Sequence, residues 1–130
     1  MYSFYTQAGL PTTAQPYGGW ERTSGTRFQG HFFGHYISAL SQSYATTTDP
    51  TIKAALLAKL TTAVDGLERA QKAYAALDPA NAGYVAPFST SVLPSGGSGL
   101  LVPFYNLHKV LAGLLDAHQQ APEAVSDKAL

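Results

Sequence analysis

The chain contains no cysteine among its 130 residues. Disulfides, thiolate nucleophiles and zinc sites built on sulfur are therefore excluded within it, and the redox compartment stays open. Charged side chains are also scarce, because they make up 12% of the residues and give a formal net charge of zero. Nucleic acid and anionic membrane surfaces require a basic patch, so neither partner is expected. No apolar run approaches the roughly 18 residues of a membrane-spanning helix, and none is predicted.

The apolar residues, 45% of the chain, suffice for one hydrophobic core. We expect a single domain over 1–130, with two parts that differ in pattern. Residues 1–27 contain scattered glycine and proline without a sustained period, which predicts an extended N-terminal arm. Residues 28–130 show helical spacing and predict an all-α region. The first residues show no sorting signal, and only the low charge with many Ser, Thr, Tyr and Gln residues favours an extracellular bacterial protein.

Three helices are predicted from the spacing of apolar residues, over 28–48, 49–76 and 103–119. The first has no charged residue, which indicates a helix buried on more than one side. The second starts at the capping pair Asp49-Pro50 and keeps one face for solvent. This alternation of inner and outer helices favours stacked helix pairs, whose uncovered apolar faces leave room for a second copy of the chain.

The third predicted helix is bordered by less regular segments. A glycine-rich loop over 95–99 precedes it, and Pro122 with Glu123 predicts a short fourth helix after it. His108 lies at the edge of the apolar stripe of the third helix. We expect this stripe to face the core through Phe104, Leu107, Leu111, Leu114 and Leu115.

The first predicted helix carries two contrasting stripes. Its apolar stripe consists of Phe33, Ile37, Leu40 and Tyr44. At about 100° per residue, the polar stripe opposite consists of His31, His35, Ser38 and Gln42. Two imidazoles one helical turn apart can reach a common metal or ligand, so the histidine pair is the sharpest local signal of a site.

Three interpretations of the pair of His31 and His35 remain open. A zinc ion needs three or four protein ligands, so His108 or Glu21 would have to join the pair. In a packed interior, backbone carbonyls could instead satisfy both imidazoles. The third interpretation is a polar stripe that binds the hydroxyl groups of a ligand with help from Gln42.

Trp20 and Glu21 follow two glycines and combine the only tryptophan of the chain with a carboxylate. An exposed indole beside an acceptor is typical of a sugar-binding platform, whereas a buried indole would only anchor the arm. Glycoside hydrolysis uses two carboxyl groups about 5 to 10 Å apart. Apart from Glu21, the acidic residues of the chain occupy predicted caps, turns or solvent-exposed helix faces. No catalytic residue is therefore assigned, and the candidates for sugar binding are His31, His35, His108, Trp20, Glu21 and Gln42.

Five strings of the sequence carry a family pattern. They are AGLP at 8–11, YGGWE at 17–21, GHFFGHYISAL at 30–40, GYVAPF at 83–88 and PFYNLHKVLAGLLDA at 103–117. In this order, and over nearly the whole chain, the sequence resembles the N-terminal part of the catalytic domain of the β-L-arabinofuranosidase-like glycoside hydrolases, which are glycoside hydrolase family 127 and its relatives.

The resemblance implies an (α/α)6 barrel, whose first helical hairpins this chain would form. It also implies that His31, His35 and His108 face a terminal arabinofuranose inside the barrel. The family pattern further includes a cysteine nucleophile, a zinc ion held by cysteines and a glutamate, and a glutamate acid/base. None of these maps onto this chain, which has no cysteine. Zinc is therefore expected only in a downstream part of the family domain.

Two explanations account for the missing nucleophile. The chain is either an N-terminal piece of a glycosidase that acts on L-arabinofuranosyl glycans or a degenerate relative of such an enzyme. In both cases we expect the chain alone to be inactive, because loss of a nucleophile costs orders of magnitude in rate. A different class of function stays open as well: a non-catalytic helical module that binds sugar or protein through its uncovered apolar faces.

Overall fold

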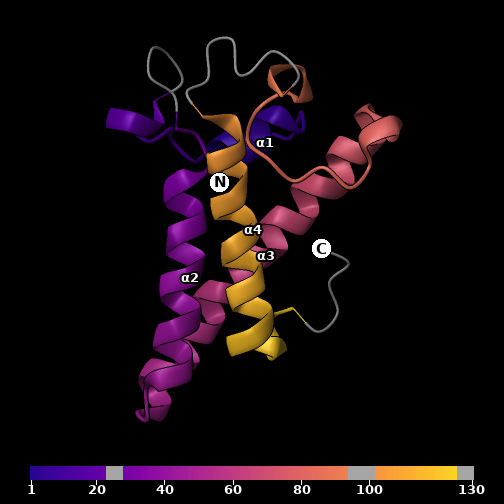
Figure 1. Cartoon of the computed structure of the whole chain (residues 1–130). Helices are drawn as coiled ribbons and strands as arrows, with labels where there is room; N and C mark the ends of the chain where they lie inside the picture. The colour runs from indigo at the N-terminus through magenta and orange to yellow at the C-terminus, as the bar shows by residue number, and fades with distance from the viewer. Residues whose placement is uncertain (23–27, 94–101, 126–130) are drawn as a thin grey trace.

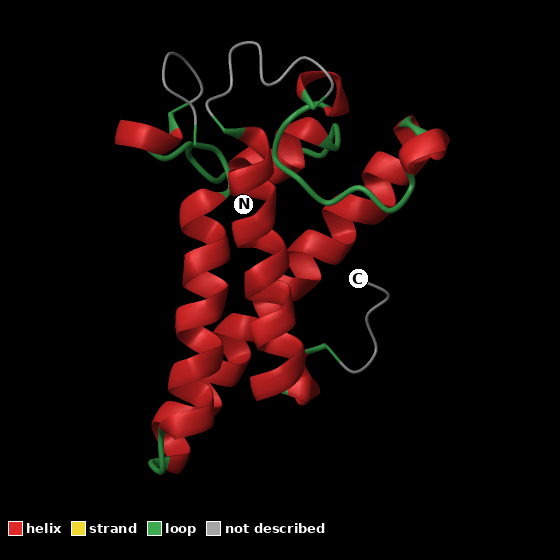
Figure 2. Ribbon diagram, in the orientation of Figure 1, coloured by secondary structure: helices red, strands yellow, loops and turns green. Residues whose placement is uncertain are grey.

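The structure is a computed structural model that describes residues 1–22, 28–93 and 102–125. The regular elements of these segments are all helical (Figure 1, Figure 2). The α-helices are α1 (Tyr2–Gln7), α2 (His31–Thr46), α3 (Pro50–Leu77) and α4 (Pro103–Gln120). Short 3-10 turns are η1 (Gly19–Glu21), η2 (Pro79–Asn81), η3 (Thr90–Val92) and η4 (Pro122–Ala124). The all-α prediction is confirmed for these segments, and none of their helices is both long and apolar enough to cross a bilayer.

Helices α2 and α4 lie side by side and run in the same direction (Figure 1). Their contacts advance together along both helices, because Gly30 lies against Val110 and Ile37 lies against Gly113. Helix α3 connects them, packs on α2 and runs back, tilted, toward the other end (Figure 1). This order of inner, outer and inner helix is that of stacked helix pairs. The described residues contain one such unit, and the complete (α/α)6 barrel stays a prediction.

The contact between α2 and α4 depends on two glycines that leave no room for a side chain. A Cβ atom on Gly34 would collide with the backbone carbonyl of Lys109. A Cβ atom on Gly113 would lie 2.6 Å from the carbonyl oxygen of Gly34. Because a backbone atom cannot move aside without shifting its helix, larger residues here would push the two helices apart. The close packing brings the first turns of α2 and α4 near enough to share a site.

The apolar stripe of α2 is buried against α3, as its spacing predicts. The buried side chains of this contact are Phe33, Ile37, Leu40 and Tyr44 of α2 with Leu60, Val64 and Leu67 of α3. Helix α3 also begins where the sequence predicts. Asp49 accepts hydrogen bonds from the N–H of Thr51 at 2.8 Å and of Ile52 at 3.1 Å, and proline occupies the first helical position.

The prediction of an extended arm over 1–27 is wrong for two segments, which form α1 and η1. Helix α1 has six residues, too few to show a hydrophobic period. Phe4 and Ala8 are buried, and the ring centre of Phe4 lies 5.5 Å from that of Phe33. A helix this short depends on such tertiary packing rather than on helix propensity, so the local sequence does not reveal it.

The face of α4 that packs against α2 is not the predicted apolar stripe. The buried residues of α4 are Pro103, Asn106, Val110, Gly113 and Ala117. Of the predicted stripe, Phe104, Leu111 and Leu115 are instead 63%, 49% and 55% exposed. The close approach of the two helices at Gly34 admits small residues better than leucine, so side-chain size as well as hydrophobicity selects the buried face.

The predicted short fourth helix is a single 3-10 turn, η4, within the described residues. Its predicted continuation falls on 126–130, which lie outside the described residues. The predicted glycine-rich loop at 95–99 also lies outside them.

Candidate functional site

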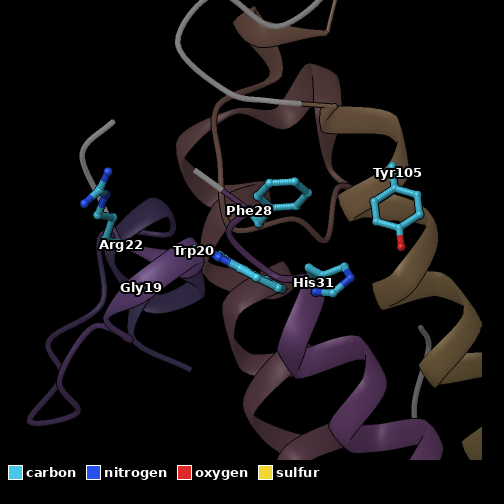
Figure 3. Close-up of a pocket in the computed structure, with 6 residues that line it drawn as sticks. All are labelled: Gly19, Trp20, Arg22, Phe28, His31 and Tyr105. Atoms are coloured by element: carbon cyan, nitrogen blue, oxygen red, sulfur yellow. The ribbon is translucent and has the colours of Figure 1, made fainter. Parts of the chain in front are cut away.

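A pocket of about 520 Å³ opens at the N-terminal ends of α2 and α4 (Figure 3). Its lining residues are Gly19, Trp20, Arg22, Phe28, His31 and Tyr105. They come from η1 and the residue after it, from the start of α2 and from the first turn of α4. Its volume falls in the range of pockets that hold one small ligand, about 300 to 1,000 Å³. The pocket exists because parallel packing brings the first turns of both helices to the same end.

The imidazole pair expected from the sequence is formed at this end of α2. The ring centres of His31 and His35 lie 4.7 Å apart, with their planes at 77°. A third ring comes from α4, where Tyr105 stacks on His31 with ring centres 5.4 Å apart and planes at 25°. Figure 3 shows His31 and Tyr105 facing each other from the two helices. His31 is thus enclosed by rings on two sides, while His35 lies on the exposed side of the pair.

The environment of His31 favours the neutral form of its imidazole. Burial lowers the pKa of His31, and electrostatic interactions with His35 and Lys109 lower it further. The Nζ atom of Lys109 lies 4.7 Å from the ring centre of Tyr105, close to the stacked pair. A neutral imidazole offers one N–H donor and one acceptor, which match the two hydrogen-bonding roles of a hydroxyl group.

Aromatic rings form much of the pocket wall and remain accessible. Trp20 is 75% exposed and Tyr105 is 44% exposed. The rings of Phe28 and His31 form a T-shaped pair, with ring centres 5.8 Å apart and planes at 72°. Arg22 adds a charged hydrogen-bond donor. An accessible aromatic face can cover the C–H face of a sugar ring while neighbouring polar groups bind its hydroxyls.

The carboxylate of Glu21 faces the start of α2. It accepts hydrogen bonds from the backbone N–H groups of Gly30, at 3.1 Å, and of Phe32. Gly30 is the N-cap residue, has no side chain with which to cap the helix and adopts a φ of 91°. Glu21 therefore acts as the cap of α2. A hydrogen bond from a sugar hydroxyl would have to compete with these two backbone donors.

His108 and Gln42 lie outside the pocket. His108 is exposed, and its position two residues from both Asn106 and Val110 puts it on the side of α4 opposite the face packed on α2. The structure thus brings His31 and His35 together without His108, and the ring of α4 that reaches them is that of Tyr105. Gln42 is exposed on α2, about 10 Å along the helix axis beyond His35.

Four lining residues were not identified from the sequence: Gly19, Arg22, Phe28 and Tyr105. Tyr105 lies one helical turn before His108 in the string at 103–117, so both residues were available as candidates. The two are distinguished by the face of α4 that contacts α2, which was assigned to the leucines. The small residues Gly113 and Ala117 mark the face of α4 that can approach another helix closely. If that face is turned toward α2, Tyr105 lies nearer to α2 than His108 does, and this signal could have selected Tyr105.

The described residues do not fit the zinc site that the resemblance implies. The sequence has no cysteine, and no three His, Asp or Glu side chains of the described segments are grouped so that they could hold a metal ion. Glu21 is engaged by α2, and His108 lies on the far side of α4. Neither of them therefore supplies the third ligand that the pair of His31 and His35 would need.

Comparisons with known proteins agree with the resemblance carried by the five strings. No curated protein matches the chain. A family model described as β-L-arabinofuranosidase, GH127 catalytic domain, matches residues 1–126. This match includes the pocket residues and all four α-helices. The chain therefore belongs to the family of GH127 β-L-arabinofuranosidase catalytic domains, a family of glycoside hydrolases.

Proposed function

We propose that this chain forms the first helical hairpins of a glycoside hydrolase domain and supplies part of the subsite for a terminal L-arabinofuranosyl unit. The observation that carries the proposal is the pocket between α2 and α4, where accessible aromatic rings surround an imidazole whose pKa is lowered by burial. Membership of a glycoside hydrolase family supports a carbohydrate as the ligand.

The groups of the proposed subsite have distinct roles. Trp20 and Tyr105 pack against the C–H faces of the sugar ring. His31 donates one hydrogen bond to a sugar hydroxyl and accepts another. His35 does not line the pocket, but its ring centre lies 4.7 Å from that of His31, and it adds a polar group beside the pocket. Arg22 donates hydrogen bonds from the arm side of the pocket.

The remaining candidates act at a greater distance from the sugar. His108 and Gln42 contribute only to a glycan longer than one ring, because both lie outside the pocket. Glu21 supports the pocket wall through the start of α2 rather than through the ligand. The proposed subsite therefore consists of residues near the first turns of α2 and α4.

We propose that the chain alone does not hydrolyse glycosides. It has no cysteine to act as the nucleophile that the family pattern implies. Both carboxylate oxygens of Glu21 accept hydrogen bonds from α2, so this residue is not free to act as an acid or base. The purified chain should release the aryl group of an aryl β-L-arabinofuranoside at the background rate. Turnover above background would contradict this part of the proposal.

Calorimetric titration with L-arabinose and L-arabinosyl oligosaccharides tests the subsite. We expect His31→Ala to weaken the affinity about tenfold, because the sugar loses both hydrogen bonds of the imidazole. Gln42→Ala is the matched control on the same helix and should change the affinity for a single sugar by less than about twofold. Equal losses in both variants, or no binding to the unmodified chain, would contradict the subsite.

A second candidate function is a non-catalytic helical module that associates through α4. Leu111 and Leu115 are exposed and border a groove of about 460 Å³ that also includes Val85 and Val125. Exposed apolar patches of this kind mark interaction surfaces. Light scattering should then detect self-association that Leu111→Glu reduces. A strictly monomeric chain at high concentration would contradict a module that binds its own copy.

A further inference from the structure

The turn that carries Trp20 is tied to the start of α2 at two points. The carbonyl oxygen of Trp20 accepts a hydrogen bond from the N–H of Phe28 at 2.9 Å. The carboxylate of Glu21 accepts hydrogen bonds from the N–H of Gly30 at 3.1 Å and from the N–H of Phe32. These links hold η1 against the first turn of α2.

The indole of Trp20 has few restraints of its own. It is mostly exposed, so side-chain packing does little to hold it, and its position follows from the backbone of η1 (Figure 3). Gly18 and Gly19 precede it, and Gly19 adopts a φ of 60°, which is open to glycine and strained for other residues. The arm also contacts α2 before this point, because the ring centre of Tyr17 lies 5.1 Å from that of Phe32. Gly18 and Gly19 separate this contact from Trp20, so the nearer restraint comes from the residue that follows, Glu21.

We propose that Glu21 is a positioning residue of the sugar pocket: its carboxylate holds η1 on the first turn of α2 and thereby keeps the Trp20 indole at the pocket wall near His31. The part of this inference that concerns sugar rests on the proposed function, whereas the link between η1 and α2 is a property of the free chain. Glu21 makes no contact with the sugar in this arrangement and acts through Trp20.

The link should persist when Glu21 is protonated. Burial raises the pKa of the Glu21 carboxyl, against the opposing effects of the Phe32 and Gly30 amides and the amino group of Met1. Tyr17 is a further titratable neighbour, and the pKa of its phenol is raised by burial and then by the charge of Glu21. A neutral carboxyl is a weaker acceptor than a carboxylate. The raised pKa shows that burial outweighs this effect, so the link should persist on acidification.

The fluorescence of Trp20 measures this link directly, because it is the only tryptophan of the chain. We expect Glu21→Ala to lower the fluorescence anisotropy of Trp20 while the helix content, followed by circular dichroism, is retained. Asp49→Ala is the matched control, because it removes a cap with two backbone donors from α3. The control should leave the anisotropy unchanged. No change in Glu21→Ala, or equal changes in both variants, would overturn the proposal.

A second variant keeps the test decisive if Glu21→Ala does not fold. Glu21→Gln retains the length of the side chain, but one of its terminal atoms is an N–H donor and cannot accept a hydrogen bond from an amide. Glu21→Gln should therefore lower the anisotropy of Trp20, though less than Glu21→Ala, because one acceptor oxygen remains. An anisotropy equal to that of the unmodified chain would contradict the assignment to Glu21.

Sugar binding separates the positioning role from the proposed function. In calorimetric titrations with L-arabinosyl oligosaccharides, Glu21→Ala should weaken the affinity about fivefold, the factor expected for one lost capping interaction. Asp49→Ala should leave the affinity unchanged. If the unmodified chain binds no sugar, the proposed function fails and the anisotropy still tests the link. If Glu21→Ala changes the anisotropy but not the affinity, the positioning role is overturned and the subsite stands.

Discussion

Helices α2 and α3 satisfy free N–H groups at their starts with carboxylates from very different places in the sequence. Asp49 caps α3 from the position directly before it, with Thr51 and Ile52 as donors at 2.8 and 3.1 Å. Helix α2 begins after Gly30 and receives its cap from Glu21, across nine and eleven residues of sequence. The difference is one of distance along the chain, because both caps are carboxylates that accept from two amides.

A local cap stabilises one helix, whereas a distant cap also fixes a second segment of the chain. Asp49 is exposed, and both of its donors belong to the helix that directly follows it. Glu21 is partly buried and holds η1 together with α2, so its loss should affect Trp20 as well as the helix. The candidate site thus lies at the helix start whose cap comes from another segment.

A methyl group at the start of α2 should give the largest effect on stability. Gly30 has a left-handed backbone with φ of 91°, and a Cβ atom there would lie 2.7 Å from the Cγ atom of Pro87. The proline ring cannot rotate away, so we expect Gly30→Ala to lower the free energy of unfolding by about 3 kcal/mol. In the first turn of α3, Pro50→Ala should cost less than about 1 kcal/mol. Urea unfolding measures both free energies. Similar losses in the two variants would contradict the claim that the start of α2 is the more tightly packed of the two.

Removal of the two caps should destabilise the chain more at α2 than at α3. Glu21→Ala leaves two amides without their acceptor, one of them on the buried Gly30, for which we expect a loss of about 2 kcal/mol. Asp49→Ala leaves amides at an exposed helix end, where water replaces part of the hydrogen bonding, and should cost about 1 kcal/mol. The free energies of unfolding in urea test this order. A larger loss in Asp49→Ala would show that the distant cap is the weaker one.

The charge of Glu21 should give the stability a pH dependence with a definite sign. Burial raises the pKa of this carboxyl in the folded chain, so the folded chain binds the proton more tightly than the unfolded chain. The resulting stabilisation is complete below the ordinary value of 4.5 and is lost as the pH rises through the raised value. The free energy of unfolding should therefore fall, relative to that of Glu21→Gln, as the pH rises across this window. A difference that rises with pH would contradict the burial of the carboxyl.

Positioning should follow stability in its response to acid. Protonation of Glu21 removes the cost of burying a charge, which favours the folded chain with the carboxyl held against α2. The same protonation weakens the hydrogen bonds to Gly30 and Phe32, but the raised pKa shows that burial is the larger effect. The anisotropy of Trp20 should therefore not fall as Glu21 is protonated. A fall in anisotropy over the range in which the stability rises would contradict this order of effects.

The features that the sequence predicts well depend on residues within one or two helical turns of each other. Asp49 and Pro50 are adjacent, so the start of α3 follows from local capping chemistry. His31 and His35 are one turn apart on one helix, so their juxtaposition follows from helix geometry alone. The buried face of α2 follows in the same way from its apolar period.

The features that the sequence did not reveal depend on contacts between distant segments. The cap of α2 comes from Glu21, whose neighbours in sequence suggest a sugar platform rather than a helix cap. The buried face of α4 is set by the close approach at Gly34, and the predicted stripe chose leucines such as Leu111 because they are the more hydrophobic residues. Tyr105 enters the pocket as a consequence of that same packing. Each of these outcomes requires the relative placement of helices, which no local pattern contains.

The smallest effect is expected on α4, where two neighbouring rings point to different sides. His108 lies opposite the face packed on α2, so His108→Ala should change the affinity for L-arabinose by less than about twofold. Tyr105, one turn earlier, stacks on His31, and Tyr105→Ala should weaken that affinity about tenfold. Both variants remove a ring from an exposed position of the same helix. A difference between their affinities therefore reports how close each ring lies to the start of α2. Equal losses would place the sugar on the outer side of α4 and remove the pocket between α2 and α4 as its subsite.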